Sequence, residues 1–92
     1  MIRSFRHKGL RALYQQGDTR GVKAEHAPRL RRILAALDTA QSAKDMDLPG
    51  YRLHGLKGSL SGYWAVSISG NWRVIFRFVD NDVELLDYLD YH

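Results

Sequence analysis

The stretch YWAVSISGNWRVIFRFVDNDVELLDYL, residues 63–89, decides the fold because apolar and polar residues alternate through most of its length. Alternation with a period of two is typical of half-buried β-strands. Gly70-Asn71 suits a two-residue hairpin turn, and Asp80-Asn81 marks the next turn. The stretch therefore predicts an antiparallel meander of three strands, to which YRLHGL (51–56) and the N-terminal MIRSF (1–5) could add further strands.

Two helices are expected ahead of this sheet. Leu10, Leu13 and Tyr14 share one face of the first helix, which Ser4 would cap and Gly17 would end. The second helix combines an apolar stripe, an opposite face of arginines and a proline in its first turn: Leu30, Ile33, Leu34 and Leu37; Arg29, Arg31 and Arg32; and Pro28. Helices followed by strands indicate an α+β fold, with the N-terminal helices packed on one face of a mostly antiparallel sheet.

The register of the strands determines which side chains share a face. A two-residue turn at 70–71 places Arg73 opposite Ile68. A two-residue turn at 80–81 places Arg73 opposite Tyr88, Asn71 opposite Asp90 and Arg77 opposite Glu84, a favourable pair of charges. The expected core face is Trp72, Val74, Phe76, Phe78, Val83, Leu85 and Leu89, with Asp87 as an unexplained polar member. The expected polar face is Arg73, Tyr88 and Asp90, with His92 beyond.

Length and composition predict one small soluble domain over residues 1–92. The absence of cysteine excludes a disulfide, a thiol nucleophile and a thiolate metal site, and it agrees with a cytoplasmic location. The start MIRSFRHKGL lacks the apolar core of a signal peptide, and no stretch is long enough to cross a membrane.

Charge is distributed unevenly along the chain. Residues 1–79 carry all fourteen Lys and Arg with five acids, whereas residues 80–92 carry five acids and no base. A strongly basic body is typical of a protein that binds polyanions. A solvated basic surface neutralised by the acidic last strand explains the same pattern, so charge alone leaves both interpretations open.

Several side chains in this inventory suit cleavage of a phosphodiester beside a ribose hydroxyl. That reaction needs a base, an acid and cations for the charge that develops on phosphorus. Histidines such as His54 and His92 can act as acid or base near neutral pH, and the α-carboxylate of His92 would favour its protonated form and the acid role. Lys57 and Arg73 could hold the phosphate, and Tyr91 could stack on a base.

Each of these residues also has an ordinary structural interpretation. A loop histidine such as His54 is usually only solvated, Lys57 beside Gly58 suits a turn, and Asn71 suits the hairpin. Arg73 could shield the sheet or pair with Asp90. A metal site built from His54, Asp90 and His92 has no local spacing in its favour, so no metal and no cofactor are expected. His7 and His26 lie in basic helical surroundings and are interpreted as surface residues.

Five motifs resemble, in order, the HigB branch of the RelE toxin superfamily: MIRSFRHKGL, YRLHGLKG, GYW, NWRVIF and the final DYH. Together they span almost the whole chain. The resemblance implies a RelE-like compact α+β ribonuclease fold. It also implies a toxin of a type II toxin–antitoxin system that cuts mRNA in the ribosomal A site, without metal, through the neighbouring 2′-OH. The catalytic residues implied are His54, Lys57, Asp90, Tyr91 and His92, and the substrate contacts are Asn71 and Arg73.

The same resemblance implies several partners. Basic residues on the helices would dock onto ribosomal RNA, and a HigA-type antitoxin protein would suppress the toxin and carry it to operator DNA. The base stays open between His54 and Asp90. Two other functions remain: a catalytically silent module that binds the antitoxin and the operator complex, and a ribonuclease that needs no ribosome.

Overall fold

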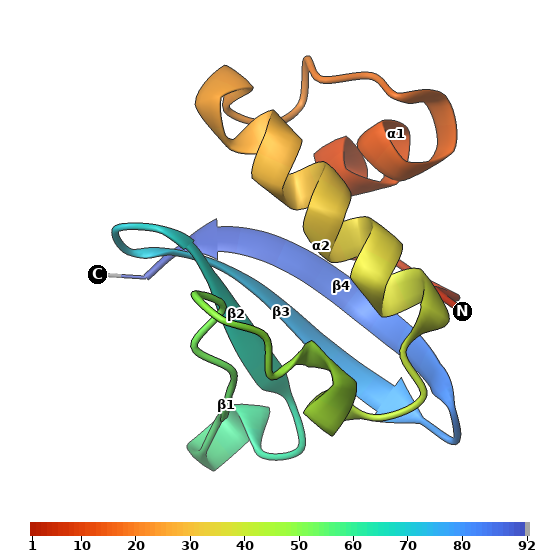
Figure 1. The fold of residues 1–92 in the computed structure, drawn as a ribbon, viewed down its shortest axis with the longest axis vertical. Coiled ribbons are helices and arrows are strands. Elements are labelled where there is room, and N and C mark those ends of the chain that lie inside the picture. Colours follow the sequence, from red (N-terminus) through yellow and green to blue (C-terminus); the bar gives the residue numbers. More distant parts are fainter. Residues whose placement is uncertain (92) are drawn as a thin grey trace.

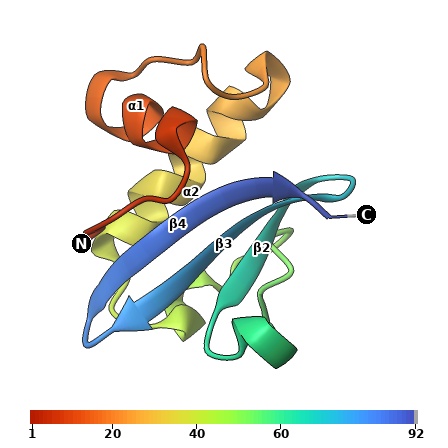
Figure 2. The same ribbon diagram turned by 180° about the vertical axis from the view of Figure 1, so that it is seen from behind.

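The computed structural model describes residues 1–91, which form two α-helices and one four-stranded sheet (Figure 1). The strands are antiparallel neighbours in the order β1-β2-β3-β4. Both α-helices lie on one face of the sheet, and Figure 2 shows the opposite, outer face. The α+β class is therefore confirmed. The elements are α1 (Lys8–Gln16), η1 (Ala24–His26), α2 (Ala27–Thr39), η2 (Ala43–Met46), β1 (His54–Gly55), η3 (Gly58–Leu60), β2 (Trp64–Ser69), β3 (Trp72–Val79) and β4 (Asp82–Asp90).

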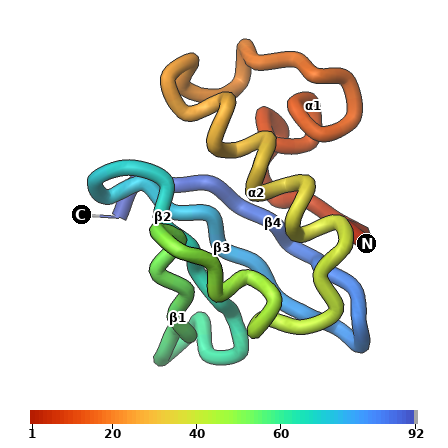
Figure 3. Tube along the Cα trace, in the orientation of Figure 1, coloured from red at the N-terminus to blue at the C-terminus, as the bar shows by residue number. Residues whose placement is uncertain are grey.

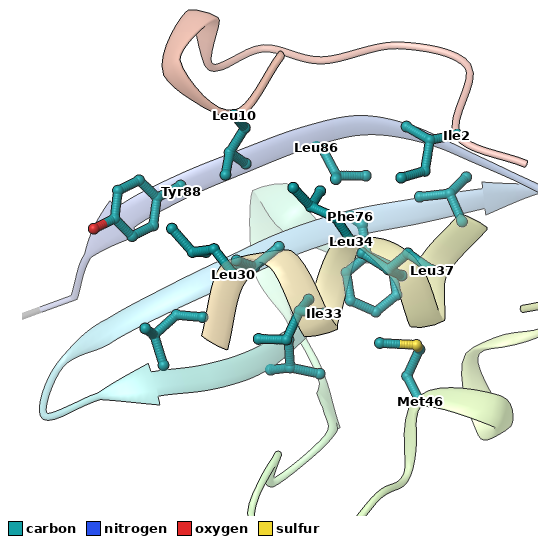
Figure 4. Packing of buried hydrophobic residues seen from close by; sticks show 14 of the residues in the cluster. Ile2, Leu10, Leu30, Ile33, Leu34, Leu37, Met46, Phe76, Leu86 and Tyr88 are labelled. Carbon is teal, nitrogen blue, oxygen red and sulfur yellow. The ribbon is translucent and has the colours of Figure 1, made fainter. Parts of the chain in front are cut away.

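The hydrophobic core lies between α2 and the inner face of the sheet (Figure 4). The predicted apolar stripe of α2 is fully or almost fully buried there, and it meets Phe76 of β3 and Leu86 of β4. Pro28 lies in the first turn of α2, as predicted. Arg29 does not face away from the sheet with Arg31 and Arg32, as was predicted. Its guanidinium donates to the carbonyls of Ser67, at 3.0 Å, and Gly50, at 2.7 Å. This contact ties α2 to β2.

The start of α1 differs from the prediction. His7 caps the helix, since its Nδ1 accepts a hydrogen bond from the Leu10 N–H at 3.2 Å. Ser4 lies in the extended arm that precedes α1, and its Oγ instead accepts a hydrogen bond from the Leu85 N–H at 2.9 Å. Gly17 ends the helix in the left-handed conformation, φ 69°, as predicted.

Two glycines bring α1 and the following loop into direct contact. A Cβ built on Gly9 would lie 2.2 Å from the carbonyl oxygen of Gly21, and one built on Gly21 would lie 2.5 Å from the Gly9 Cα. No side chain fits between backbones at this distance. The close approach holds the loop that carries Arg20 and Lys23 beside the sheet.

The first residues of the chain run along the outer edge of β4 (Figure 2). Ile2 pairs in parallel with Val83, and Phe5 pairs in parallel with Leu86. The Arg6 N–H donates to the carbonyl of Leu86 at 2.7 Å. The expected strand-like N-terminal segment is thus confirmed, and this arm, residues 1–6, covers an edge that would otherwise be open.

The hairpin between β2 and β3 has the predicted two-residue turn but a different register. Ser69 pairs with Trp72, and a bulge between Ser67 and Ser69 then shifts the pairing. Arg73 consequently lies opposite Ser67 and not Ile68. An extra residue on one strand moves every later pair by one.

A second bulge shifts the register of β4. The predicted pair Arg77–Glu84 is confirmed, but beyond it two residues of β4, Leu85 and Leu86, stand opposite one residue of β3. Leu85 has a φ of 57°, which is uncommon outside glycine. The arm supports this conformation because Ser4 accepts the Leu85 N–H, which the ladder leaves free.

This bulge exchanges the two faces for the second half of β4. Leu86 and Tyr88 face the core, where they are 0% and 4% exposed. The predictions that Leu85 and Leu89 belong to the core, and that Tyr88 faces away from it, are wrong. Asp87 moves to the outer face, which removes the unexplained acid from the core.

Candidate functional site

One row of side chains crosses the outer face of the sheet. His54 pairs with Ala65, Ala65 with Ile75, and Ile75 with Asp87. Directly paired residues point to the same side of a sheet. Ala65 and Ile75 are only 0% and 3% exposed, yet they stand outside the main core cluster. They form the apolar floor of the outer face, with His54 at one side and Asp87 at the other.

His54 is exposed, and one of its ring nitrogens is fixed. Its Nδ1 lies 2.9 Å from the carbonyl oxygen of Arg52. A carbonyl can only accept, so Nδ1 carries the proton of this hydrogen bond. In the neutral ring the other nitrogen, Nε2, is then unprotonated and can accept a proton from a substrate. Arg52 has a φ of 51°, a strained conformation for this residue that aims its carbonyl at the ring.

Arg73 shares the outer face with His54 and lies in the next row, opposite Ser67 and Leu89. Its Nη1 donates to the carbonyls of Gly70, at 2.8 Å, and Trp72, at 3.1 Å. These acceptors are uncharged, and Arg73 takes part in none of the ion pairs formed within residues 1–91, so no described carboxylate neutralises the oriented guanidinium. His54 and Arg73 therefore lie on the same face of the sheet.

Three further predicted site residues lie at two ends of this face: Lys57, Asn71 and Tyr91. Lys57 is exposed and follows β1, directly before η3. Asn71 lies in the β2–β3 turn, and its carbonyl accepts the Tyr91 N–H at 2.7 Å. The described chain thus ends beside this turn (Figure 3). Two predicted site residues remain, Asp90 and His92. Asp90 belongs to the described chain, whereas His92 lies outside the described residues.

Asp90 does not share a face with Arg73, and the register predicted for it is wrong. It pairs with Trp72, whose ring stacks on Tyr88 at 4.7 Å on the helix side of the sheet. Asp90 accordingly lines a cavity of about 380 Å³ between the sheet and the loop after α1, together with Lys23. The cause is the bulge at Leu85, which moves each later residue of β4 by one position.

A buried histidine lies behind this cavity. His26 is 4% exposed, and its Nδ1 is 2.5 Å from the Tyr88 hydroxyl. Burial lowers the pKa of His26 and raises the pKa of Tyr88, so both are neutral near pH 7. Burial also lowers the pKa of His7, against the effect of Asp87. The interpretation of His7 and His26 as surface residues is wrong, because one caps α1 and the other joins η1 to β4.

The sequence reasoning missed three residues of the outer face. Asp87 was assigned to the core, and Arg6 and Tyr63 were not considered. Arg6 lies with its guanidinium 5.9 Å from the centre of the Tyr63 ring. No sequence signal could have identified them, since their positions depend on the arm and on the second bulge.

The described residues contain no metal centre. Within residues 1–91, no three His, Asp or Glu side chains are grouped so that they could hold a metal ion. His54 and Asp90, two members of the metal site considered above, point to opposite faces of the sheet. Neither α-helix of this part of the chain has the length and hydropathy needed to cross a bilayer.

Comparison with known proteins assigns the chain to a family. A family model described as the RelE-like toxin of the type II toxin–antitoxin system HigB matches residues 3–92. The chain is 44% identical to Endoribonuclease HigB of Proteus vulgaris over 92 residues, which is all of both chains. It is 34% identical to Toxin HigB-1 of Vibrio cholerae over 94 residues, covering 100% of this chain and 98% of that protein.

The fold has a counterpart among solved structures. A crystal structure of a YafQ mutant from E. coli matches with a TM-score of 0.64, covering 98% of this chain and 93% of that one at 17% identity. This similarity concerns the fold alone. The family match and the two full-length relatives are more specific, and the expected resemblance is confirmed. The chain belongs to the HigB-like family of RelE-like toxins from type II toxin–antitoxin systems.

Proposed function

We propose that this toxin is an endoribonuclease that cuts messenger RNA in the A site of the ribosome. Its relative from Proteus vulgaris carries the name Endoribonuclease HigB. One observation carries the proposal: an oriented histidine, His54, and an oriented arginine, Arg73, lie on the same open face of the sheet. A base and a cation are two of the three kinds of group that cleavage of a phosphodiester requires.

His54 is the proposed general base. Because Nδ1 donates to the carbonyl of Arg52, Nε2 of the neutral ring is available to take the proton of a ribose 2′-OH. The 2′-oxygen then attacks phosphorus, and the bond to the 5′-oxygen breaks. The products are a 2′,3′-cyclic phosphate and a 5′-hydroxyl, which receives a proton from the acid. No metal ion takes part in this sequence of steps.

The other residues have supporting roles in this proposal. Arg73 and Lys57 stabilise the negative charge that develops on the phosphorane oxygens. Asn71 contacts a base, and Tyr91 stacks on one. Asp90 and His92 act from the chain end, with His92 as the acid. The β2–β3 turn, which binds the Tyr91 N–H, fixes where that end leaves the sheet.

The ribosome would supply what this face lacks. The outer face is open and carries few acid–base groups, so an unrestrained RNA would rarely adopt the geometry for in-line attack. Exposed arginines of α2, such as Arg31 and Arg32, would bind ribosomal RNA, with a strong dependence on salt. This activity takes place where ribosomes translate, in the cytoplasm. A HigA-type antitoxin would inhibit it and link the toxin to operator DNA.

The test is a reaction of purified protein with ribosomes programmed with one messenger, followed by mapping of RNA ends. Cleavage in the A site is expected. It should be unchanged when EDTA chelates the Mg²⁺ that the ribosomes do not need to stay intact. His54→Gln and Lys57→Gln should lose at least tenfold in rate. Lys44→Gln, which removes an equally exposed lysine from η2, is the matched control.

A catalytically silent binding module is the alternative, and one observation favours it: Asp90 faces the helix side and not His54. The same reaction distinguishes the two. Ribosome binding without new RNA ends would identify the module. Cleavage of free RNA at an equal rate would identify a ribonuclease that needs no ribosome. Full activity of His92→Ala would exclude the chain end from catalysis.

A further inference from the structure

Three side chains, Arg6, Tyr63 and Arg77, form a bridge that closes one end of the outer face. Tyr63, the residue before β2, is 9% exposed and lies between two guanidinium groups. The Arg6 Cζ is 5.9 Å from the centre of its ring, and the Arg77 Cζ is 5.7 Å from it. Arg6 comes from the arm at one edge of the sheet, and Tyr63 comes from the side of β1 and β2. Their side chains meet above the strands between them.

The arm determines the direction of the Arg6 side chain. The Arg6 N–H donates to the Leu86 carbonyl at 2.7 Å, and the Leu86 N–H donates to the Ser4 carbonyl at 3.2 Å, so the arm is held like an extra strand. Phe5 packs against the core, with its ring 5.5 Å from that of Tyr14. The Arg6 side chain lies on the other side, on the outer face, where its guanidinium contacts the Tyr63 ring.

The two arginines of the bridge differ in their charge environment. Arg77 forms a salt bridge with Glu84, to which its Nε donates at 3.0 Å, and that carboxylate neutralises it. Arg6 is absent from the ion pairs formed within residues 1–91. A ring face attracts and orients a guanidinium but carries no net charge. The donors of Arg6 thus remain available for an anion.

The bridge is adjacent to the proposed site. Tyr63 comes directly before Trp64, and the next residue, Ala65, pairs with His54. Arg77 and Arg73 are four residues apart on β3, about 13 Å at the usual rise per residue. The row that contains His54 therefore lies between the Arg73 row and the bridge. A polyanion that crosses His54 meets Arg73 on one side and Arg6 on the other.

We propose that Arg6, oriented by Tyr63, binds a backbone phosphate of the RNA next to the one that Arg73 holds. This inference rests on the proposed function. A guanidinium presents a planar fork that matches phosphate oxygens and stays charged at every physiological pH. The site contributes to affinity for any RNA sequence, because a phosphate contact reads no base. Arg6 is a positioning residue and does not touch the reacting atoms.

The experiment measures binding of a short fluorescent 2′-O-methyl RNA, which has no free 2′-OH to attack. Affinity is determined by anisotropy at several salt concentrations for the unmodified protein, Arg6→Gln, Arg6→Lys and Lys44→Gln. Lys44→Gln removes one positive charge from an exposed position of η2 and controls for net charge. Circular dichroism verifies that each variant is folded.

Arg6→Gln should lose about tenfold in affinity, as expected for one charge-assisted contact, and its salt slope should fall by about one. Arg6→Lys should recover part of the affinity, and Lys44→Gln should change it little. Equal losses for Arg6→Gln and Lys44→Gln would overturn the proposal, as would equal affinity of Arg6→Gln and the unmodified protein. The same holds if neither protein binds the RNA. Failure of the ribosome reaction would defeat the proposed function but leave this comparison of affinities intact.

Discussion

The imidazole of His26 and the hydroxyl of Tyr88, 2.5 Å apart, join the helical layer to the end of β4. Tyr88 also stacks on Trp72, which pairs with Asp90. The contact therefore lies directly under the part of the chain from which the proposed catalytic end departs. It stabilises the fold on the side opposite to the proposed RNA-binding face.

Tyr88→Phe should lower the free energy of unfolding by about 1–3 kcal/mol, because it leaves the buried Nδ1 of His26 without a partner. Urea denaturation followed by fluorescence measures the change. Tyr14→Phe is the control, since the Tyr14 hydroxyl donates to Asp38 at 2.7 Å in an exposed position, and its effect should stay within about 0.5 kcal/mol. Equal effects of the two substitutions would contradict the importance of burial.

Stability should fall as the pH falls below 6.5. Burial lowers the pKa of His26 from its ordinary value of 6.5, with Lys23 acting in the same direction and Glu25 against it. The unfolded chain then binds a proton that the folded protein does not, so the stabilisation is complete above pH 6.5 and is lost as the pH falls through the lowered pKa. Melting temperatures measured between pH 7.5 and pH 5, about the range over which histidine titrates, give the slope.

His26→Gln should reduce this slope and leave the smaller part that comes from His7, whose pKa is also lowered. A slope that is the same in His26→Gln and in the unmodified protein would assign the acid sensitivity to other groups. The carboxyl of Asp82, whose pKa is lowered by the hydrogen bond from Arg3, acts only at more acidic pH.

Arg73→Lys should reduce cleavage on the ribosome at least tenfold although it keeps the positive charge. The guanidinium donates to the carbonyls of Gly70 and Trp72 while it faces outward. A lysine ammonium cannot keep both contacts and also donate to two oxygens of one phosphate. Rates at saturating protein are compared with those of Lys44→Arg, an exchange of the same two basic residue types at an exposed position of η2. An active Arg73→Lys variant would show that charge alone suffices.

Gly9→Ala should destabilise the protein by about 1–3 kcal/mol, the usual range for overpacking. Helix propensity predicts the opposite sign, since alanine is favoured over glycine inside a helix by about 1 kcal/mol. The contact decides, because the new Cβ would lie 2.2 Å from the Gly21 carbonyl oxygen. Thermal unfolding measures the effect, and Gln15→Ala in the exposed part of α1 is the control. A gain in stability would mean that the loop moves away freely.

The helices and turns could be predicted because their signals are local. The stripe of α2, Gly17 at the end of α1, and the turns at 70–71 and 80–81 each depend on a few neighbouring residues. The pair Arg77–Glu84 was correct because it lies close to its turn. Predicted register is reliable only up to the first irregularity in a strand.

The bulges could not be predicted, and most of the errors follow from them. Leu85 adopts a positive φ without being glycine or asparagine, so the sequence carries no sign of it. What holds it there is Ser4, a residue 81 positions earlier. Because Asp87, Tyr88 and Asp90 come after this point, each was assigned to the wrong face. The burial of His26 follows from the same shift, since its partner is Tyr88.

The arm along β4 has a consequence for the synthesis of this toxin. Residues 2 and 5 are translated long before their partners, residues 83 and 86. Contacts between such distant parts of a chain form late. The sheet edge, the bulge at Leu85 and the placement of Arg6 can therefore be completed only after translation of β4.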